Sequence, residues 1–234
     1  MKIVYRPEID GLRAIAVFSV IFYHANLVIF DKNFLSGGFL GVDIFFVISG
    51  YLITSIILRE IYKTNNFSFI NFYERRIRRI IPALFFVILC SLPFAYLILF
   101  MEPIIDFSKS IISSIFFISN IYFNFTGNVY GEEHTLLKPL LHTWSLSVEE
   151  QFYILFPIFL VITIRFFKKY LFFFLSIVFL ISIGFSSYLS IYHPSFNFYQ
   201  IFSRAFELLL GSLLSYYELK NARFHSLPGG VADG

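Results

Sequence analysis

Long apolar runs constrain the fold of this chain more than any other feature of its sequence. Five runs of about 20 residues carry few charges, at about 11–30, 38–58, 80–100, 171–192 and 199–217. A helix needs roughly 20 apolar residues to cross the hydrocarbon core of a bilayer, which is about 30 Å thick. The runs therefore predict transmembrane helices.

Two further stretches leave the number of spans open. The stretch at about 149–167 begins with two glutamates but is otherwise strongly apolar. The stretch at about 104–123 carries an aspartate, a lysine and several serines, so it either spans the bilayer or lies as a re-entrant or interfacial segment. The sequence thus predicts an all-α fold, a polytopic transmembrane helix bundle with six to seven spans over residues 1–220. A short, polar, Gly-rich end at 221–234 is expected to be frayed or truncated.

The composition favours lipid as the solvent. The chain is 58% hydrophobic and only 14% charged, whereas about 25% of the residues of a soluble domain are charged. The net charge is +3, and a basic excess in a membrane protein marks cytoplasmic loops, not nucleic-acid binding. The single cysteine, Cys90, lies in an apolar run without a partner for a disulfide or a metal site. We expect a lipid bilayer as partner, no nucleic acid, no metal and no permanently bound cofactor.

Basic residues predict which side of the membrane each loop faces. They form four groups: at the N-terminus, between the second and third runs, after 149–167, and after the last run. The positive-inside rule places all four in the cytoplasm if 104–123 does not cross, and 124–150 then lies outside. If 104–123 crosses, 124–150 is cytoplasmic and the third basic group is external. Loop charge favours the first topology, with a cytoplasmic N-terminus in the cell inner (cytoplasmic) membrane.

Ionisable residues within the apolar runs are candidates for function, because charge at membrane depth costs several kcal/mol. Arg13 and His24 lie in the first run, and eleven steps of about 100° point both side chains the same way. The helical rise separates them by about 16 Å. One stripe of this helix would therefore carry a cation near the inner face and a titratable base deeper in the membrane.

Asp43 lies near the outer end of the second run, at a depth similar to that of His24. A carboxylate facing the imidazole would fix its tautomer and raise its basicity, as in acyl-transfer sites. The alternative is a structural aspartate at a helix start beside several glycines. In the last run, Arg204 and Glu207 are three residues apart and can pair on one face, with Gly211 allowing close helix approach. A purely structural ion pair explains them equally well.

Two polar segments flank apolar runs. The segment FYERRIRRIIP at 72–82 holds four arginines, whose forks suit phosphate: Arg75, Arg76, Arg78 and Arg79. The alternative is that these arginines only set topology and touch anionic lipid. The segment LLHTWSLSVEEQFY at 140–153 holds functional groups suited to a polar substrate such as a sugar, among them His142, Trp144, Ser145 and Glu150. No G-x-S-x-G elbow surrounds its serines, so a serine esterase is disfavoured.

Five ordered motifs resemble the acyltransferase-3 family of membrane O-acyltransferases. They are YRPEIDGLRAIAV with YHA, GGFLGVDIFFVISGYLI, FYERRIRRIIPAL, LLHTWSLSVEEQFY and RAFELLLG. The family modifies O-antigen of lipopolysaccharide, peptidoglycan, exopolysaccharides, macrolides and nodulation factors. The resemblance covers about 210 residues. Because the family has about ten transmembrane helices, this chain is expected to be an N-terminal portion of the domain.

The resemblance implies an acyl-CoA donor, usually acetyl-CoA, and a saccharide or lipid-linked glycan as the acceptor of the acyl group. It implies that His24 is catalytic and that Arg13 and the arginines at 75–79 handle the donor. Glu150 belongs to a family motif of less defined role. We hypothesise that His24, oriented by Asp43, is the general base, and direct transfer and a transient acyl-enzyme both stay open. The alternatives are an inactive fragment and a transporter or flippase-like protein for polysaccharides.

Overall fold

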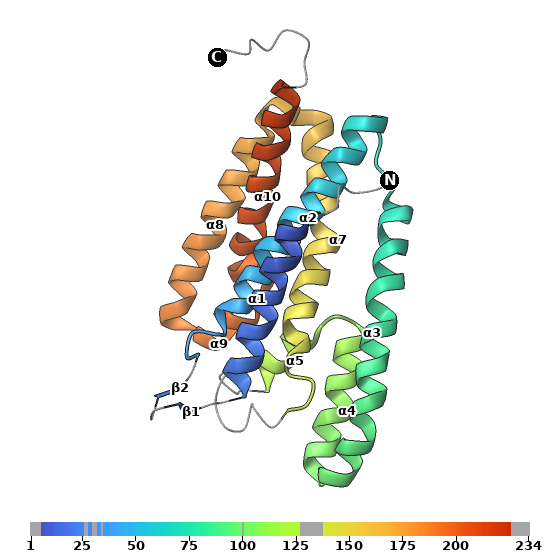
Figure 1. Ribbon diagram of the computed structural model, residues 1–234, viewed down its shortest axis with the longest axis vertical. Helices are drawn as coiled ribbons and strands as arrows, with labels where there is room; N and C mark the ends of the chain where they lie inside the picture. Colours follow the sequence, from blue (N-terminus) through green and yellow to red (C-terminus); the bar gives the residue numbers. More distant parts are fainter. Residues whose placement is uncertain are drawn as a thin grey trace. The chain divides into compact units, whose positions relative to one another are not determined.

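The fold is all-helical, as predicted, apart from one very short hairpin. A computed structural model describes residues 6–25, 28–29, 32–33, 35–99, 101–126 and 138–225 (Figure 1). The helices are α1 (Pro7–His24), α2 (Leu40–Thr64), α3 (Phe69–Ile98), α4 (Met101–Ile115), α5 (Ser119–Phe125), α7 (Thr143–Phe167), α8 (Leu171–Tyr192), α9 (Pro194–Tyr199) and α10 (Ile201–His225), with a 3₁₀ turn η1 (Lys168–Tyr170). The antiparallel strands β1 (Val28–Ile29) and β2 (Lys32–Asn33) pair after α1.

Three stretches of the described residues are long and apolar enough to cross a membrane. They are Leu40–Thr64, Phe69–Ile98 and Thr143–Tyr192, the last of which contains α7, η1 and α8. The count of six to seven spans is therefore not confirmed. The helices α1 and α10 carry several charged side chains each and are not among the three.

Two predicted boundaries differ from the structure. The first run was expected to be helical to residue 30, but α1 ends at His24 and β1 occupies Val28–Ile29. Val and Ile are β-branched and favour strands, which is why an apolar pattern alone was misleading here. At the other end, α10 extends to His225, and residues 226–234 lie outside the described part of the chain, so the frayed or truncated tail at 221–234 stays a prediction.

The stretch at 104–123 is not one continuous helix. The 15-residue helix α4 ends at Ile115, and a helix of that length extends only about 22 Å, less than the roughly 30 Å of a bilayer core. Phe117 adopts a left-handed conformation with φ 54°. The amide of Phe117 bonds the Ser114 carbonyl and that of Ile118 bonds the Ser113 carbonyl, which is the Schellman pattern that ends helices. The break favours the re-entrant or interfacial interpretation of this stretch.

The chain forms two compact units, which are described separately. The first comprises 1–66, 163–181 and 205–234, and the second comprises 67–162 and 182–204. In the first unit α2 packs directly on α1 (Figure 1). A Cβ atom at Gly41 would lie under 3.0 Å from the Ala16 carbonyl oxygen, and one at Gly38 would meet Ser19 equally closely. These two glycines let the backbones of α1 and α2 approach each other.

A second pair of glycines joins α2 to α10 in the same unit. A Cβ atom at Gly50 would collide with the backbone of Leu208, and one at Gly211 would collide with the backbone of Val47. The contact is reciprocal, since each helix offers a glycine to the other. Small residues at such crossings are typical of helices that associate in membranes. About one turn further along both helices, the hydroxyls of Ser55 and Ser215 are 2.8 Å apart, and both residues are buried.

The second unit is held together by buried hydrogen bonds that join the end of α4 and the turn after it to α5 and α7. The Ser119 and Ser147 hydroxyls are 2.7 Å apart, and Thr143 bonds to the Ser114 hydroxyl at 2.8 Å. The Gln151 amide donates to the Phe117 carbonyl at 2.9 Å, which stabilises the left-handed turn. Buried polar groups are costly unless they are hydrogen-bonded, so these pairs fix which faces of the helices meet.

The glycine crossing gives a direct stability prediction. Gly50→Ala places a methyl group against the backbone of Leu208, which cannot rotate away, and overpacking of this kind costs about 1–3 kcal/mol. We expect the thermal unfolding midpoint in detergent to fall by about 3–10 °C.

The matched control is Gly184→Ala in α8, where no atom lies within 4 Å of the added Cβ. Its midpoint should stay level or rise slightly, because alanine is the better helix former. Equal midpoints for wild type and Gly50→Ala would contradict the crossing.

Candidate functional site

The predicted catalytic histidine lies at the last residue of α1. His24 is exposed, and its Nδ1 lies 2.9 Å from the Val20 carbonyl oxygen. A carbonyl only accepts hydrogen bonds, so Nδ1 carries the proton and the neutral ring has its lone pair on Nε2. The ring packs edge-on against Tyr23, and Tyr23 packs against Phe39 just before α2. His24 can therefore accept a proton at a defined ring nitrogen.

Asp43 lies in the first turn of α2 and is half-buried. The close approach at Gly38 and Gly41 places the start of α2 against the second half of α1, the segment that ends in His24. The carboxylate and the imidazole thus come from adjoining segments of one unit. Since the Val20 carbonyl bonds Nδ1, it sets the tautomer, and an orienting role for Asp43 stays a prediction.

Arg13 and His24 belong to one uninterrupted helix, as the predicted spacing requires. The Arg13 side chain is partly buried and pairs with Asp10 at 3.4 Å, on the same face one turn earlier. The helical rise keeps the two groups about 16 Å apart along α1. Four of the predicted site residues lie in the first unit: Arg13, His24, Asp43 and Glu207. Glu207 is buried, with 4% of its surface exposed.

The four predicted donor-binding arginines lie in the first three turns of α3, which begins at Phe69. They have different surroundings. Arg76 lies over the ring of Tyr153, with its Cζ 4.2 Å from the centroid, and also over Phe72 at 5.8 Å. Arg78 pairs with Glu74 at 2.6 Å on the exposed side, and Arg75 and Arg79 are exposed. Arg76 is therefore held by an aromatic partner from another helix, Tyr153 of α7.

Arg76 brings the arginine motif and the 140–153 motif together within the second unit. Its positive charge attracts the carboxylate of Glu150, which Glu149 repels. Glu150 is 9% exposed, and its Oε1 has no hydrogen-bond partner among the described residues. The Tyr153 hydroxyl donates to Glu149 at 3.0 Å, which holds the ring under the guanidinium. Sequence reasoning found both motifs but missed Tyr153 as the residue that joins them.

Tyr73 adds a second link between the same helices. Its hydroxyl donates to the carbonyl of Ile154 at 3.2 Å and lies 3.4 Å from that of Tyr153. This side chain comes from α3, one turn before Arg76, so it fixes the register of α3 against α7. The two carbonyls can only accept, so the Tyr73 hydroxyl is the donor in this link.

A second cluster of predicted residues gathers around Trp144 in the same unit. The Arg204 guanidinium lies 5.7 Å from the Trp144 ring and 5.0 Å from that of Phe198, and its Nε donates to the Phe198 carbonyl at 3.2 Å. Trp144 is 1% exposed and also packs on Tyr199. It thus covers Arg204 in this arrangement, and substrate contact by Trp144 stays a prediction. His142 is exposed just before α7, and the Ser145 hydroxyl bonds the His142 carbonyl at 3.1 Å.

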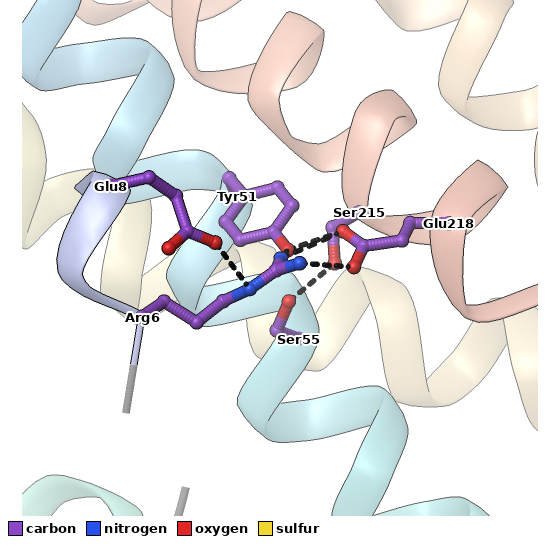
Figure 2. A network of polar contacts seen from close by, with 6 residues as sticks. All are labelled: Arg6, Glu8, Tyr51, Ser55, Ser215 and Glu218. Carbon is purple, nitrogen blue, oxygen red and sulfur yellow. Dashed lines mark hydrogen bonds and ion pairs between the residues drawn. The ribbon is translucent and has the colours of Figure 1, made fainter. Parts of the chain in front are cut away.

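Sequence reasoning missed a polar network in the first unit (Figure 2). Arg6 pairs with Glu218 at 2.8 Å and with Glu8 at 3.0 Å. The Tyr51 hydroxyl bonds both Arg6 and Glu218. These side chains come from the start of α1, the middle of α2 and the end of α10, so the network ties together the three helices that the glycines bring close. The sequence showed Arg6 only as a loop charge, since its partner is more than 200 residues away.

Comparisons with known proteins agree with these motifs. The model of a family described as "Acyltransferase domain" matches residues 6–231. The chain is 46% identical over 164 residues to the O-acetyltransferase OatA of Staphylococcus aureus (strain NCTC 8325 / PS 47), an alignment that covers 70% of this chain and 26% of that protein. It is also 46% identical over 168 residues to a putative O-acetyltransferase of Staphylococcus aureus (strain MSSA476), covering 72% and 27%. The chain spans about a quarter of the length of these relatives, and no solved structure matches it.

The network around Arg6 predicts how stability depends on pH. Burial disfavours the charged form of Glu218, but hydrogen bonds from Arg6 and Tyr51 outweigh it and lower the pKa of Glu218 below its ordinary value of 4.5. A lowered folded-state pKa contributes stability above the unfolded value, and this is lost as pH falls through the folded value. The unfolding midpoint of the wild type should therefore fall more steeply below about pH 4.5 than that of Glu218→Gln.

Glu74→Gln serves as the control for this pH prediction, because the Glu74–Arg78 pair is exposed and such pairs contribute little. Its midpoint should follow the wild-type curve throughout. Parallel curves for wild type and Glu218→Gln between about pH 6 and pH 3 would show that Glu218 is not held by Arg6.

Proposed function

The chain belongs to the acyltransferase-3 family, and on this premise we propose that it forms part of a membrane enzyme that transfers an acyl group from acyl-CoA to a carbohydrate hydroxyl. The relatives named as O-acetyltransferases favour acetyl as the group that moves. The acceptor is a glycan of the cell envelope. The N-terminus lies in the cytoplasm, where acyl-CoA is available, on the topology that loop charge predicts.

The contact between Arg76 and the Tyr153 ring, beside the buried Glu150, is the observation that carries this proposal. It joins the arginine motif of α3 to the motif of α7, as a site that uses both requires. The donor carries phosphate groups, and guanidinium binds phosphate through two parallel hydrogen bonds without losing its charge. Arg75 and Arg79 are exposed on the same helix and can add to this binding. In the proposed site, the Tyr153 ring holds Arg76 in position, and the Arg76 guanidinium binds a phosphate group of the acyl-CoA donor.

His24 supplies the proton chemistry in this proposal. Its Nε2 takes the proton from the acceptor hydroxyl as the hydroxyl oxygen attacks the thioester carbonyl carbon. The carbon–sulfur bond then breaks, and the CoA thiolate leaves and takes up the proton. In a route through an acyl-enzyme, His24 Nε2 accepts the proton of the attacking group and returns it to the leaving group in each of the two half-reactions. Asp43 would stabilise the imidazolium that forms between proton uptake and release.

A histidine substitution tests the role of His24 in acyl transfer. General acid–base catalysis contributes about 10²–10⁴-fold, so His24→Ala in the complete protein should lower kcat for labelled acetyl transfer to glycan at least 100-fold. The control is His193→Ala, an exposed histidine just before α9.

His193→Ala should keep wild-type activity, and both variants should show the wild-type unfolding midpoint. Near-normal transfer by His24→Ala would overturn the proposed chemistry. Transfer that is absent even in the wild type, while polysaccharide crosses vesicles that contain the protein, would support the transporter alternative.

The aromatic support of Arg76 gives a separate kinetic prediction. Arg76→Ala should raise KM for acetyl-CoA about tenfold, the effect of losing about 1.4 kcal/mol of binding. Tyr153→Leu removes the ring beneath the guanidinium and should raise this KM several-fold, whereas Tyr153→Phe keeps the ring, loses only its bond to Glu149 and should raise this KM less than Tyr153→Leu.

Lys63→Ala controls for the loss of one positive charge, since Lys63 is exposed in the last turn of α2. Its KM for acetyl-CoA should not change. If Lys63→Ala and Arg76→Ala raise this KM equally, the effect of Arg76 comes from its positive charge alone and not from a specific contact with the donor.

A further inference from the structure

A cavity in the second unit lies outside all the motifs described above. Its volume is about 470 Å³, and it is lined by residues from the end of α3, from α4 and α5, and from the segment that leads into α7. Its polar lining is Glu102, Asp106, Ser110, Thr126 and Lys138. Pockets of about 300–1,000 Å³ bind small ligands, so the cavity has room for one or two sugar residues.

The charged groups of the cavity are arranged around a shared space. Glu102 and Asp106 are four residues apart on α4, so they project from one face of that helix. Lys138 lines the same cavity from the segment before α7, and its Nζ donates to the Thr126 hydroxyl at 3.1 Å. Asp106 attracts the ammonium group of Lys138. An ammonium group has three N–H donors, so the bond to Thr126 leaves Lys138 with capacity for a ligand.

Tyr122 fixes the wall of the cavity. Its hydroxyl donates to the backbone carbonyl of Asp106 at 3.2 Å, which joins α5 to α4 beside the carboxylates. The rings of Phe107 and Phe123 form an apolar part of the lining and are almost fully buried. Lys138 also lies 6.0 Å from the Phe123 ring centroid. The cavity therefore offers acceptors, a cationic donor and flat apolar surface together.

This combination selects one chemical class of ligand. Two carboxylates against one ammonium disfavour a phosphate or another anion, which excludes the CoA donor from this cavity. A purely apolar ligand would leave three charged groups without compensation. A sugar has hydroxyls that donate to carboxylates and accept from an ammonium, and C–H faces that pack on aromatic rings. An uncharged or amino sugar therefore satisfies every part of the lining.

We propose that this cavity binds a saccharide, as the site for a sugar unit of the glycan acceptor. The term acceptor rests on the proposed function, whereas sugar binding itself does not. The predicted topology supports this assignment, because it places the 124–150 segment, with Thr126 and Lys138, outside the cell membrane, where envelope glycans lie. Asp106 and Lys138 are the specificity-determining residues, since they line the cavity from different elements and offer the sugar hydroxyls an acceptor and a donor.

Two near-isosteric substitutions test the cavity, with the intact protein in nanodiscs and chitotriose and maltotriose as probes in calorimetric titration. The wild type should bind at least one probe saturably. Asp106→Asn and Lys138→Met should each raise its Kd tenfold or more, while the KM for acetyl-CoA stays within twofold. Lys109→Met is the matched control, because Lys109 is exposed on α4 one turn from the cavity and does not line it.

Lys109→Met should leave the Kd within twofold of the wild-type value, and unfolding midpoints verify that each variant folds. If Lys138→Met does not fold, Asp106→Asn decides the result. Unchanged Kd values in the folded variants, or no saturable binding of either probe, would overturn the sugar site. Binding of inorganic pyrophosphate that is lost in Lys138→Met would overturn the sugar site and indicate an anion site instead. Sugar binding that depends on Asp106, in a protein without acetyl transfer, would keep the sugar site and reject the proposed function.

Discussion

The first unit depends on how closely α2 approaches its neighbours. Glycines at 38, 41, 50 and 211 remove the side chains that would separate the helix backbones, and this gain in contact replaces the hydrophobic effect, which does not drive association between helices in lipid. Because the spacing is set by backbone contact, the positions of His24 on α1 and of the first turn of α2 follow from it. The Arg6–Tyr51–Glu218 network then fixes the register of α1 and α10 near the other end of α1.

In the second unit, hydrogen bonds and cation–π contacts determine how the helices pack on each other, as the glycines do in the first unit. The Ser114–Thr143 and Ser119–Ser147 pairs are buried, so a slip of α7 along α5 would leave hydroxyls without partners. Arg76 over Tyr153 and Arg204 over Trp144 use aromatic faces to hold guanidinium groups that would otherwise be costly to bury. The same contacts that stabilise the unit therefore place its basic groups, which is why packing and function are hard to separate by mutation at these positions.

The sequence was sufficient where secondary structure depends on local pattern. Apolar runs predicted helices, and the spacing of Arg13 and His24 on one helix is confirmed by α1. It was insufficient where distant residues decide the outcome. The left-handed turn at Phe117 uses no glycine and is supported by Gln151 from another helix, and the partner of Arg6 is Glu218. The cavity at Asp106 and Lys138 was missed for the same reason, since Asp106 was considered only as a charge within the 104–123 stretch and Lys138 only as part of the 124–150 loop.

The surroundings of Glu150 connect stability to the proposed function. Glu150 is buried near Arg76, and one of its oxygens has no hydrogen-bond partner among the described residues. Burying a carboxyl group costs free energy unless its oxygens are hydrogen-bonded, so Glu150 is a poor device for stability alone. A structural role would be served as well by an apolar residue of similar volume. Retaining a carboxylate whose hydrogen-bonding capacity is incomplete makes sense if a further donor completes it during the reaction cycle, and a substrate hydroxyl or a shared proton would be such a donor.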